Sequence, residues 1–304
     1  MSVPSSIERG NLRTLAMSHR PEKFALITGC GQGGIGEALA REYASRNITP
    51  IATVLPSESN QHLSTAGITS FPLDVTKEES ILELRENVIK RTGGYIDILV
   101  NNAGICYTMT AIDTDVNAVQ KMFDVNVFGP MRMVHHFHDA LIRSAGTVVN
   151  IGSIGGVIPY VYGASYNASK AALHHWSSTL RVEMAPFDVK VLTIISGEVG
   201  TNILKSDRER VLPENSYFSP LAKEFTQHVQ RVPVTTDRSV YAQNVVSQSL
   251  KSSPTAWFWF GNATFITRLL DAIAPRTIWD RILWGLFNFN KLREAYRAGA
   301  NKRK

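Results

Sequence analysis

The sequence of 304 residues contains only two cysteines, Cys30 and Cys106, too few for a disulfide framework. Cysteine and histidine residues never occur at the spacing of a zinc site, so we expect no metal. No apolar run approaches the roughly 18 residues of a membrane-spanning helix, and residues 1–22 lack the apolar stretch of a secretory signal. These absences favour a cytoplasmic protein with reduced thiols, in which residues 1–22 form a flexible N-terminal extension.

The first 261 residues carry no excess charge, because 23 Lys and Arg residues balance 23 Asp and Glu residues. The whole net charge of +6 therefore lies in residues 262–304, which hold nine basic and three acidic residues. A balanced body with neither a basic stripe nor a nucleic-acid motif predicts no nucleic-acid partner.

Short apolar runs alternate with longer amphipathic stretches from residue 24 onward. The apolar runs are expected to be buried strands, and they lie at residues 24–29, 48–55, 67–75, 96–104, 146–153, 189–197 and 255–261. The stretches expected to be helices lie near residues 35–46, 77–91, 114–143 and 164–185. Such alternation predicts an α/β fold with a doubly wound parallel sheet, built from residues 23–261 as one domain.

Residues 201–250 lose this alternation and contain three prolines that interrupt helical stretches. In a parallel α/β sheet, ligands bind beyond the carboxyl ends of the strands. Because the segment follows the end of the strand predicted at 189–197, we expect it to cover the substrate.

A glycine-rich segment, ITGCGQGGIG, follows the first predicted strand and opens the first predicted helix. Glycines here permit a tight turn and let backbone N–H groups approach a pyrophosphate at the positive end of a helix. Gly29, Gly34 and Gly36 are the candidate residues. The segment predicts a dinucleotide site, and a plain strand-to-helix turn is the alternative.

Tyr166 and Lys170 stand four residues apart in YNASK, thirteen residues after Ser153 in NIGSIGG. On a helix such positions share a face, so the ammonium would lie beside the phenol. A neighbouring positive charge lowers the pKa of a phenol, which suits proton transfer near neutral pH. The pair by itself is also compatible with an ordinary helix face.

Taken together, these motifs resemble those of the classical short-chain dehydrogenase/reductase family over residues 24 to about 261. TGCGQGGIG resembles the family's TGxxxGIG loop with one extra residue. The remaining matches follow in family order: NNAG at 101–104, Asn126 in DVNVFG, Ser153, the Tyr166/Lys170 pair and SGEVGT at 196–201. The resemblance implies a Rossmann-type fold and hydride transfer between a nicotinamide and a carbonyl or hydroxyl carbon.

The resemblance also implies a role for each matching residue. Tyr166 would be the general acid or base, and Lys170 would lower its pKa and bind the nicotinamide ribose. Ser153 would hydrogen-bond the reacting oxygen, and Asn126 would support a water that passes protons to Lys170. Ser196 stands where the family usually has proline, which leaves the register of the following loop open. The cofactor contacts would also include Gly29, Gly34, Ile35, Gly36, Asp74, Val75, Asn102, Ala103, Gly104, Val199 and Thr201.

The segment ATVLPSES, at the end of the second predicted strand, bears on the choice between NAD and NADP. An acidic residue there would bind the ribose hydroxyls of NAD, whereas a nearby arginine would accept the 2′-phosphate of NADP. Neither stands at the expected place. Thr53 and Ser57 can hydrogen-bond a phosphate, and we expect no carboxylate at this site to repel one, so the segment favours NADP.

The loop between Ser153 and Tyr166 is expected to give the pocket an apolar, aromatic wall, with core packing as the alternative for half of these side chains: Val157, Ile158, Tyr160 and Tyr162. Within the family, the GGIG loop and the aromatic last strand look most like fungal NADPH-dependent 1-acyl-dihydroxyacetone-phosphate reductases and related reductases of secondary metabolism. That resemblance implies a bulky apolar carbonyl or alcohol substrate, such as a lipid-like ketone, a polyketide, a terpenoid or a steroid-like compound. A non-catalytic dinucleotide sensor and a lipid-surface protein on the same scaffold are the alternatives.

Residues 262–304 combine the basic excess with apolar residues at helical spacing, such as Phe265, Ile266, Leu269 and Ile273. Two interpretations stay open. The helices fold onto the body as a pocket lid or as the contact of a homo-oligomer, or they form a basic amphipathic anchor. The anchor would give peripheral contact with an endoplasmic reticulum or lipid-droplet surface.

Overall fold

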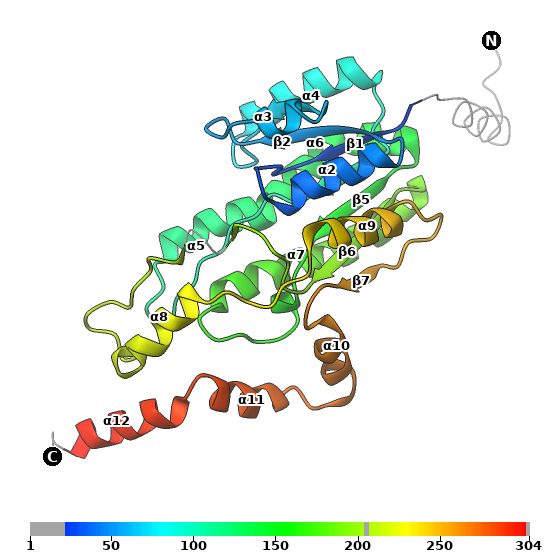
Figure 1. The fold of residues 1–304 in the computed structure, drawn as a ribbon. Helices are drawn as coiled ribbons and strands as arrows, with labels where there is room; N and C mark the ends of the chain where they lie inside the picture. Colours follow the sequence, from blue (N-terminus) through cyan, green and yellow to red (C-terminus); the bar gives the residue numbers. More distant parts are fainter. Residues whose placement is uncertain (1–21, 204–206, 302–304) are drawn as a thin grey trace, which may run out of the picture.

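A computed structural model describes residues 22–203 and 207–301, which form a doubly wound α/β fold (Figure 1). Within these residues the sheet has seven parallel strands in the order β3-β2-β1-β4-β5-β6-β7. They are β1 (Phe24–Ile27), β2 (Thr49–Val54), β3 (Thr69–Pro72), β4 (Ile98–Asn101), β5 (Thr147–Ile151), β6 (Lys190–Ser196) and β7 (Trp257–Phe260). From β1 the chain adds β2 and β3 on one side and then continues with β4 to β7 on the other side. This strand order confirms the predicted Rossmann-type sheet.

Each strand lies inside an apolar run that the sequence pattern marked. The central strands β1, β4 and β5 are buried at every residue, since helices cover both faces of the sheet, and such strands read as continuous apolar segments. The predicted N-terminal extension lies outside the described residues except for Glu22.

Two helical layers enclose the sheet. On one face α2 (Ile35–Ser45) packs beside α9 (Arg238–Ser249), with Leu39, Tyr43 and Tyr241 fully buried between them and the strands. On the other face lie α4 (Glu78–Thr92), α6 (Gly129–Ser144) and α7 (Ala164–Met184), which bury a second cluster.

The stretch predicted as one helix at 114–143 is divided by a change of helical geometry. It consists of α5 (Val116–Phe123), a π-helical segment η1 (Asp124–Phe128) and α6. A π turn inside a helix re-aims side chains and is common at functional sites. The short α3 (Gln61–Ser64), which the sequence pattern did not indicate, links β2 to β3.

Beyond the carboxyl ends of the strands lies a third apolar group, here called the aromatic cluster. Its buried members are Tyr107, Met109, Met122, Ile158, Tyr162, Phe225, Val229, Trp279, Leu283 and Phe287. They come from the loops after β4 and β5, from α5, from α8 (Ala222–Gln230) and from α11 (Ile278–Leu286) with the residue that follows it. Short 3₁₀ turns complete the connections: η2 (Ile154–Gly156), η3 (Ala185–Phe187) and η5 (Ser219–Leu221).

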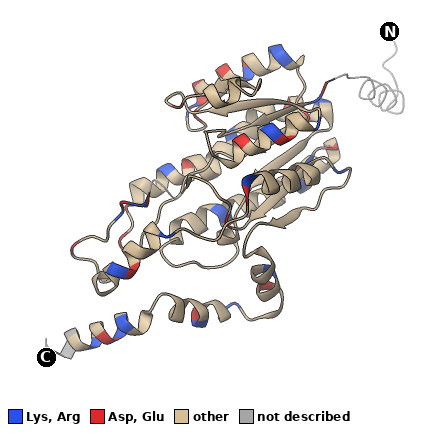
Figure 2. Ribbon diagram, viewed as in Figure 1, with Lys and Arg blue, Asp and Glu red and all other residues tan. Residues whose placement is uncertain are grey.

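The C-terminal extension runs along this end of the molecule as α10 (Thr264–Ile273), α11 and α12 (Phe289–Asn301), coloured orange to red (Figure 1). Lys291 of α12 forms a 2.8 Å ion pair with Glu224 of α8, which ties the extension to the segment after β6. Basic and acidic residues are interspersed over the body and along α12 (Figure 2). In the described part of the chain, no helix combines the length and apolarity that crossing a membrane requires.

Candidate active site

The glycine-rich loop is shaped so that only glycine fits at its two ends. Gly29 has φ +71°, and a Cβ there would lie 2.8 Å from the Cα of Ala103. A Cβ on Gly36 would overlap the carbonyl oxygen of Gly29. Gly34 precedes Ile35, the first residue of α2, and no side chain caps the helix there. The helix N-terminus therefore offers backbone N–H groups beside a close-fitting loop, which suits a pyrophosphate.

Thr53 lies beneath this loop rather than at its surface. Its hydroxyl accepts a hydrogen bond from the Gly29 N–H and donates one to the carbonyl of Ile27, at 3.3 Å each. The residue is 1% exposed. The expected direct contact between Thr53 and a 2′-phosphate is therefore wrong, because the hydroxyl is buried and already paired; Thr53 supports the loop from within.

A carboxylate does lie at the end of β2, contrary to the expectation from the sequence. Glu58 folds back from the exposed turn after β2, and its Oε2 accepts a 3.3 Å hydrogen bond from the N–H of Leu55. The same oxygen would be 3.2 Å from a Cβ on Gly31. The sequence did not indicate this contact, because the turn that returns Glu58 to the loop has no signature of its own.

The NNAG segment closes the loop from the side of β4. Asn102 donates from its side-chain amide to the carbonyls of Thr28 and Gly29, both at 2.9 Å. The Thr28 hydroxyl in turn accepts from the N–H groups of Asn102 and Ala103, both at 3.0 Å. Two adjacent strand ends are thus held in fixed register around the predicted cofactor site.

Asp74 and Val75 lie after β3, at the same edge of the sheet. The Asp74 carboxylate accepts hydrogen bonds from the N–H and hydroxyl of Thr76, at 2.9 and 2.7 Å. Val75 packs so closely on Gly129 that a Cβ there would be 2.8 Å from a Val75 methyl group. These two predicted cofactor contacts are therefore placed by a local turn and by the start of α6.

Ser153, Tyr166 and Lys170 come together at the ends of β5 and α7. The Ser153 and Tyr166 side chains lie side by side, since a Cβ on Gly155 would be 3.4 Å from Ser153 Oγ and 3.6 Å from Tyr166 Cε1. The Lys170 Nζ lies 5.8 Å from the centroid of the Tyr166 ring. Lys170 is 5% exposed and donates a 2.9 Å hydrogen bond to the carbonyl of Ile151. The helical spacing of YNASK thus places the amine and the phenol on one face of α7.

The pKa values of this pair differ from the expectation. Burial raises the pKa of the Tyr166 phenol to about 12, partly offset by its hydrogen bond with Ser153. Burial also lowers the pKa of Lys170 to about 8. The expected lowering of the Tyr166 pKa by Lys170 is therefore not seen, because desolvation by burial dominates the pKa of the phenol.

Asn126 occupies the π-helical segment η1 and is almost completely buried. Its side-chain amide donates to the Ile105 carbonyl at 2.9 Å and to the Ser169 hydroxyl at 3.1 Å, while its oxygen accepts from the Ile105 N–H at 2.9 Å. Gly104 lies between Asn126 and Lys170, since a Cβ there would be 3.3 Å from Asn126 Oδ1 and 3.6 Å from Lys170 Nζ. Asn126 thus fixes the loop after β4 against the amine.

Ser196, where the family usually has proline, ends β6 with a buried hydrogen bond of 2.5 Å to the hydroxyl of Tyr241 on α9. The next residues turn toward the predicted cofactor site, with Val199 bridged to Thr236. The Thr201 hydroxyl accepts from the N–H of Ile203 at 3.4 Å. A side-chain contact thus anchors the end of β6 in this chain.

Two further residues approach the glycine-rich loop from the segment after β6. The Asn202 amide donates to the carbonyl of Gln32 at 3.1 Å, and the Arg238 guanidinium donates to the carbonyl of Gly33. A Cβ on Gly33 would lie 2.9 Å from either side chain. Sequence reasoning missed both, because they lie about 170 and 205 residues from the loop in the sequence and carry no motif.

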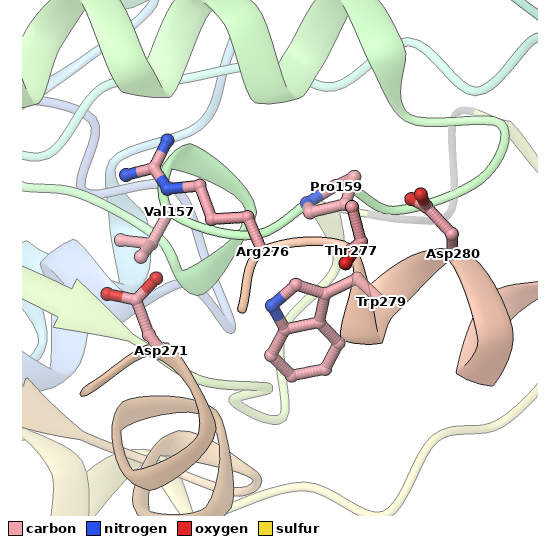
Figure 3. Close-up of a pocket in the computed structure, with 7 residues that line it drawn as sticks. All are labelled: Val157, Pro159, Asp271, Arg276, Thr277, Trp279 and Asp280. Carbon is pink, nitrogen blue, oxygen red and sulfur yellow. The ribbon is translucent and has the colours of Figure 1, made fainter. Parts of the chain in front are cut away.

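The aromatic cluster forms the wall beside Tyr166, which packs against it together with Val157 and Tyr160. Tyr162, at the centre of the cluster, has φ +66° and makes edge-to-face contacts with Phe225 and Phe287. A cavity of about 280 Å³ opens where the loop after β5 meets α10 and α11 (Figure 3). Its lining consists of Val157, Pro159, Asp271, Arg276, Thr277, Trp279 and Asp280. Across residues 22–203 and 207–301, no three His, Cys, Asp or Glu side chains are grouped to hold a metal ion.

Comparison with known proteins agrees with this geometry. The sequence model of the family described as short chain dehydrogenase matches residues 23–212, well over half of the chain. The chain belongs to the short-chain dehydrogenase family. It is therefore an oxidoreductase of the dinucleotide-binding type that acts on an alcohol or a ketone, and the alternative of a non-catalytic sensor falls away.

Its relatives within the short-chain dehydrogenase family include fungal proteins. The short-chain dehydrogenase virD of Hypocrea virens is 69% identical over 283 residues, covering 93% of this chain and 99% of the relative. The NADPH-dependent 1-acyldihydroxyacetone phosphate reductase of Schizosaccharomyces pombe is 44% identical over 206 residues, covering 66% of this chain and 70% of that protein. A short-chain dehydrogenase from Streptomyces avermitilis is structurally similar, with a TM-score of 0.72, 27% identity, and coverage of 88% and 98%.

Proposed function

We propose that this chain is an NADP-dependent ketone reductase in which Tyr166 donates the proton to the carbonyl oxygen of a bulky apolar substrate. The observation that supports it most strongly is that Ser153, after β5, lies beside Tyr166 on the face of α7 that also carries Lys170. A phenol whose pKa is raised to about 12 is fully protonated at neutral pH, so it is ready to give a proton. Carbonyl reduction needs this protonated form, since the phenol gives its proton to the reacting oxygen.

The residues divide the work between binding and proton transfer. When bound, a nicotinamide cofactor supplies the hydride. Gly29, Gly34 and Gly36 leave room for its pyrophosphate at the start of α2. Ser153 lies beside the phenol and is placed to polarise the reacting oxygen. Lys170, buried one turn below Tyr166, offers an ammonium for the nicotinamide ribose.

The proposal of NADP over NAD draws on a relative named as NADPH-dependent, which is 44% identical over 206 residues. Glu58 argues in the opposite direction, because a carboxylate beside Gly31 would repel a 2′-phosphate. Glu58 lies on an exposed turn and makes one 3.3 Å hydrogen bond. We expect it to swing into solvent when NADPH binds.

The apolar character of the proposed substrate follows from the wall beside Tyr166. Aromatic side chains from the loop after β5, from α8 and from the end of α11 meet there, with Tyr162 and Phe287 5.4 Å apart between ring centroids. Trp279, Leu283 and Phe287 are all at least 90% buried. We infer that α11 acts as a lid on the substrate pocket, so that a flat, apolar carbonyl compound gains most from binding.

The same extension carries a face that supports peripheral membrane contact in the cytoplasm. Helix α10 buries Thr264 and Thr267 but exposes four apolar side chains on the opposite face: Phe265, Ile266, Leu269 and Ile273. Phe265 is 81% exposed. The exposed Arg268 flanks that face, and Arg276 follows the helix. An apolar face with basic neighbours fits an anionic lipid surface such as that of the endoplasmic reticulum or a lipid droplet.

The membrane proposal is tested with phosphatidylcholine vesicles, with and without phosphatidylserine. We expect binding to the anionic vesicles that weakens with added salt, and a loss of at least tenfold in the variant with both Phe265→Ser and Ile273→Ser. Val182→Ser, which changes an exposed residue on α7, serves as control. Equal binding of the α10 variant and the control would overturn the proposal.

The catalytic proposal is tested by following NADPH and NADH absorbance across a panel of ketones. Tyr166→Phe should lower kcat by about 10² to 10⁴-fold while the Kd for NADPH stays within about twofold. Tyr296→Phe, which alters an exposed tyrosine of α12, is the matched control. Full turnover in Tyr166→Phe would contradict the assignment of Tyr166 as the proton donor.

A further inference from the structure

His174 lies one helical turn beyond Lys170 on α7, so Tyr166, Lys170 and His174 form a row at i, i+4 and i+8. Its 2% exposure places it in the core. Its ring does more than pack against apolar neighbours. The Nε2 atom accepts a 3.2 Å hydrogen bond from the backbone N–H of Ser153.

The loop after β5 is built around this ring. A Cβ on Gly152 would overlap His174 Nε2, and a Cβ on Gly156 would lie 2.5 Å from its Cε1 and 2.8 Å from its Nδ1. The two glycines of NIGSIGG that flank Ser153 therefore form a slot for the imidazole. Trp257 of β7 closes the slot with an edge-to-face contact at 5.4 Å between ring centroids.

The hydrogen bond determines which ring nitrogen carries the proton. Because Nε2 accepts from Ser153, the neutral ring must carry its hydrogen on Nδ1. Among the described residues Nδ1 has no hydrogen-bond partner. A buried N–H without a partner destabilises the fold. The hydrogen bond that Nε2 accepts from Ser153 explains why the ring nevertheless adopts this tautomer.

We propose that His174 is a positioning residue that holds the backbone of Ser153, and through it the Ser153 hydroxyl, in place for proton transfer by Tyr166. The Ser153 carbonyl and hydroxyl accept hydrogen bonds from the N–H groups of Gly156 and Gly155. Both of these bonds lie within the turn itself, so they do not fix the turn relative to α7. His174 ties the backbone of Ser153 itself to α7, the helix that carries Tyr166, while Lys170 of the same helix bonds the carbonyl of Ile151 two residues earlier. The inference rests on the proposed role of Tyr166.

Burial next to Lys170 keeps the ring neutral. Desolvation lowers the pKa of His174 to about 3, with the Lys170 charge contributing. The acceptor on Nε2 is therefore present throughout the pH range in which an enzyme of this kind is assayed.

The test compares His174→Leu, which removes the acceptor, with His174→Gln, whose side-chain oxygen reaches the position of Nε2. We expect kcat to fall on the order of tenfold in His174→Leu, with the Kd for NADPH within about twofold of the parent protein. His174→Gln should recover most of that loss. His175→Gln, at the exposed neighbouring histidine, is the matched control. Unchanged kcat in His174→Leu, or equal losses in both His174 variants, would overturn the proposal.

A second measurement does not depend on activity and is made on the wild-type chain. Two-bond ¹H–¹⁵N spectra of the histidine-labelled wild-type chain show which nitrogen of each ring is protonated. The His174 signals, assigned by their loss in His174→Gln, should report a proton on Nδ1. A proton on Nε2 would exclude the contact to Ser153. Because this result does not involve Tyr166, it separates a failure of the His174 proposal from a failure of the proposed reaction.

Discussion

Replacing Lys170 by methionine should reveal a conflict between stability and function. Methionine keeps nearly the length of the lysine side chain and removes its charge. The structure buries the Lys170 ammonium and lowers its pKa from the ordinary value of 10.5 to about 8. The folded chain therefore binds this proton more weakly than the unfolded chain does. The charge destabilises the fold below pH 8, and this cost fades as the pH rises toward 10.5.

The magnitude follows from the two pKa values. The cost of the buried charge is about 3 kcal/mol at pH 7 and about 1 kcal/mol at pH 10. Lys170→Met removes this cost but leaves the Ile151 carbonyl without its partner, which costs about 1 to 3 kcal/mol at any pH. The free energy of unfolding of the variant, relative to wild type, should therefore fall by roughly 2 to 3 kcal/mol between pH 7 and pH 10.

Urea unfolding of both proteins without cofactor measures this difference at each pH. Other groups that titrate in the range affect both chains and cancel. Lys251→Met, at an exposed lysine, should show no such trend. Turnover by Lys170→Met should be lost at every pH. A relative stability that is the same at pH 7 and pH 10 would refute the burial of the ammonium.

Three further changes test other parts of the structure. Glu58→Gln removes the carboxylate beside Gly31 and should tighten NADPH binding about three- to tenfold in a fluorescence titration. Weaker NADH binding with unchanged NADPH binding would instead assign Glu58 to the ribose hydroxyls of NAD. Trp279→Ala removes about 3 to 5 kcal/mol of packing from the lid and should raise KM for apolar ketones. Trp284 is 40% exposed, so Trp284→Ala should leave KM unchanged. Equal effects of the two substitutions on KM would contradict the lid. Ser196→Ala leaves a buried phenol unpaired and should cost about 1 to 3 kcal/mol in urea unfolding, and an unchanged midpoint would show that this contact does not anchor β6.

Local patterns in the sequence were sufficient to predict the sheet and the Tyr166–Lys170 pair. A strand covered on both faces must be apolar throughout, so runs such as 146–153 indicate their own burial. Tyr166 and Lys170 share a helix face because 3.6 residues make a turn, and the positions of Gly29 and Gly36 follow from a strand that turns directly into a helix. Each of these inferences depends on neighbours within about eight residues.

Only the tertiary structure decided the properties that depend on distant segments. The pKa values of Tyr166 and Lys170 follow from desolvation, which no spacing along the chain reveals. The return of Glu58 to Gly31 needed the folded turn after β2. The C-terminal extension reads as amphipathic in sequence, yet which face is buried is set by its partners: α11 packs Trp279 into the aromatic cluster, while α10 exposes Phe265. An apolar periodicity predicts that a face will be covered, and the partner that covers it is chosen by the fold.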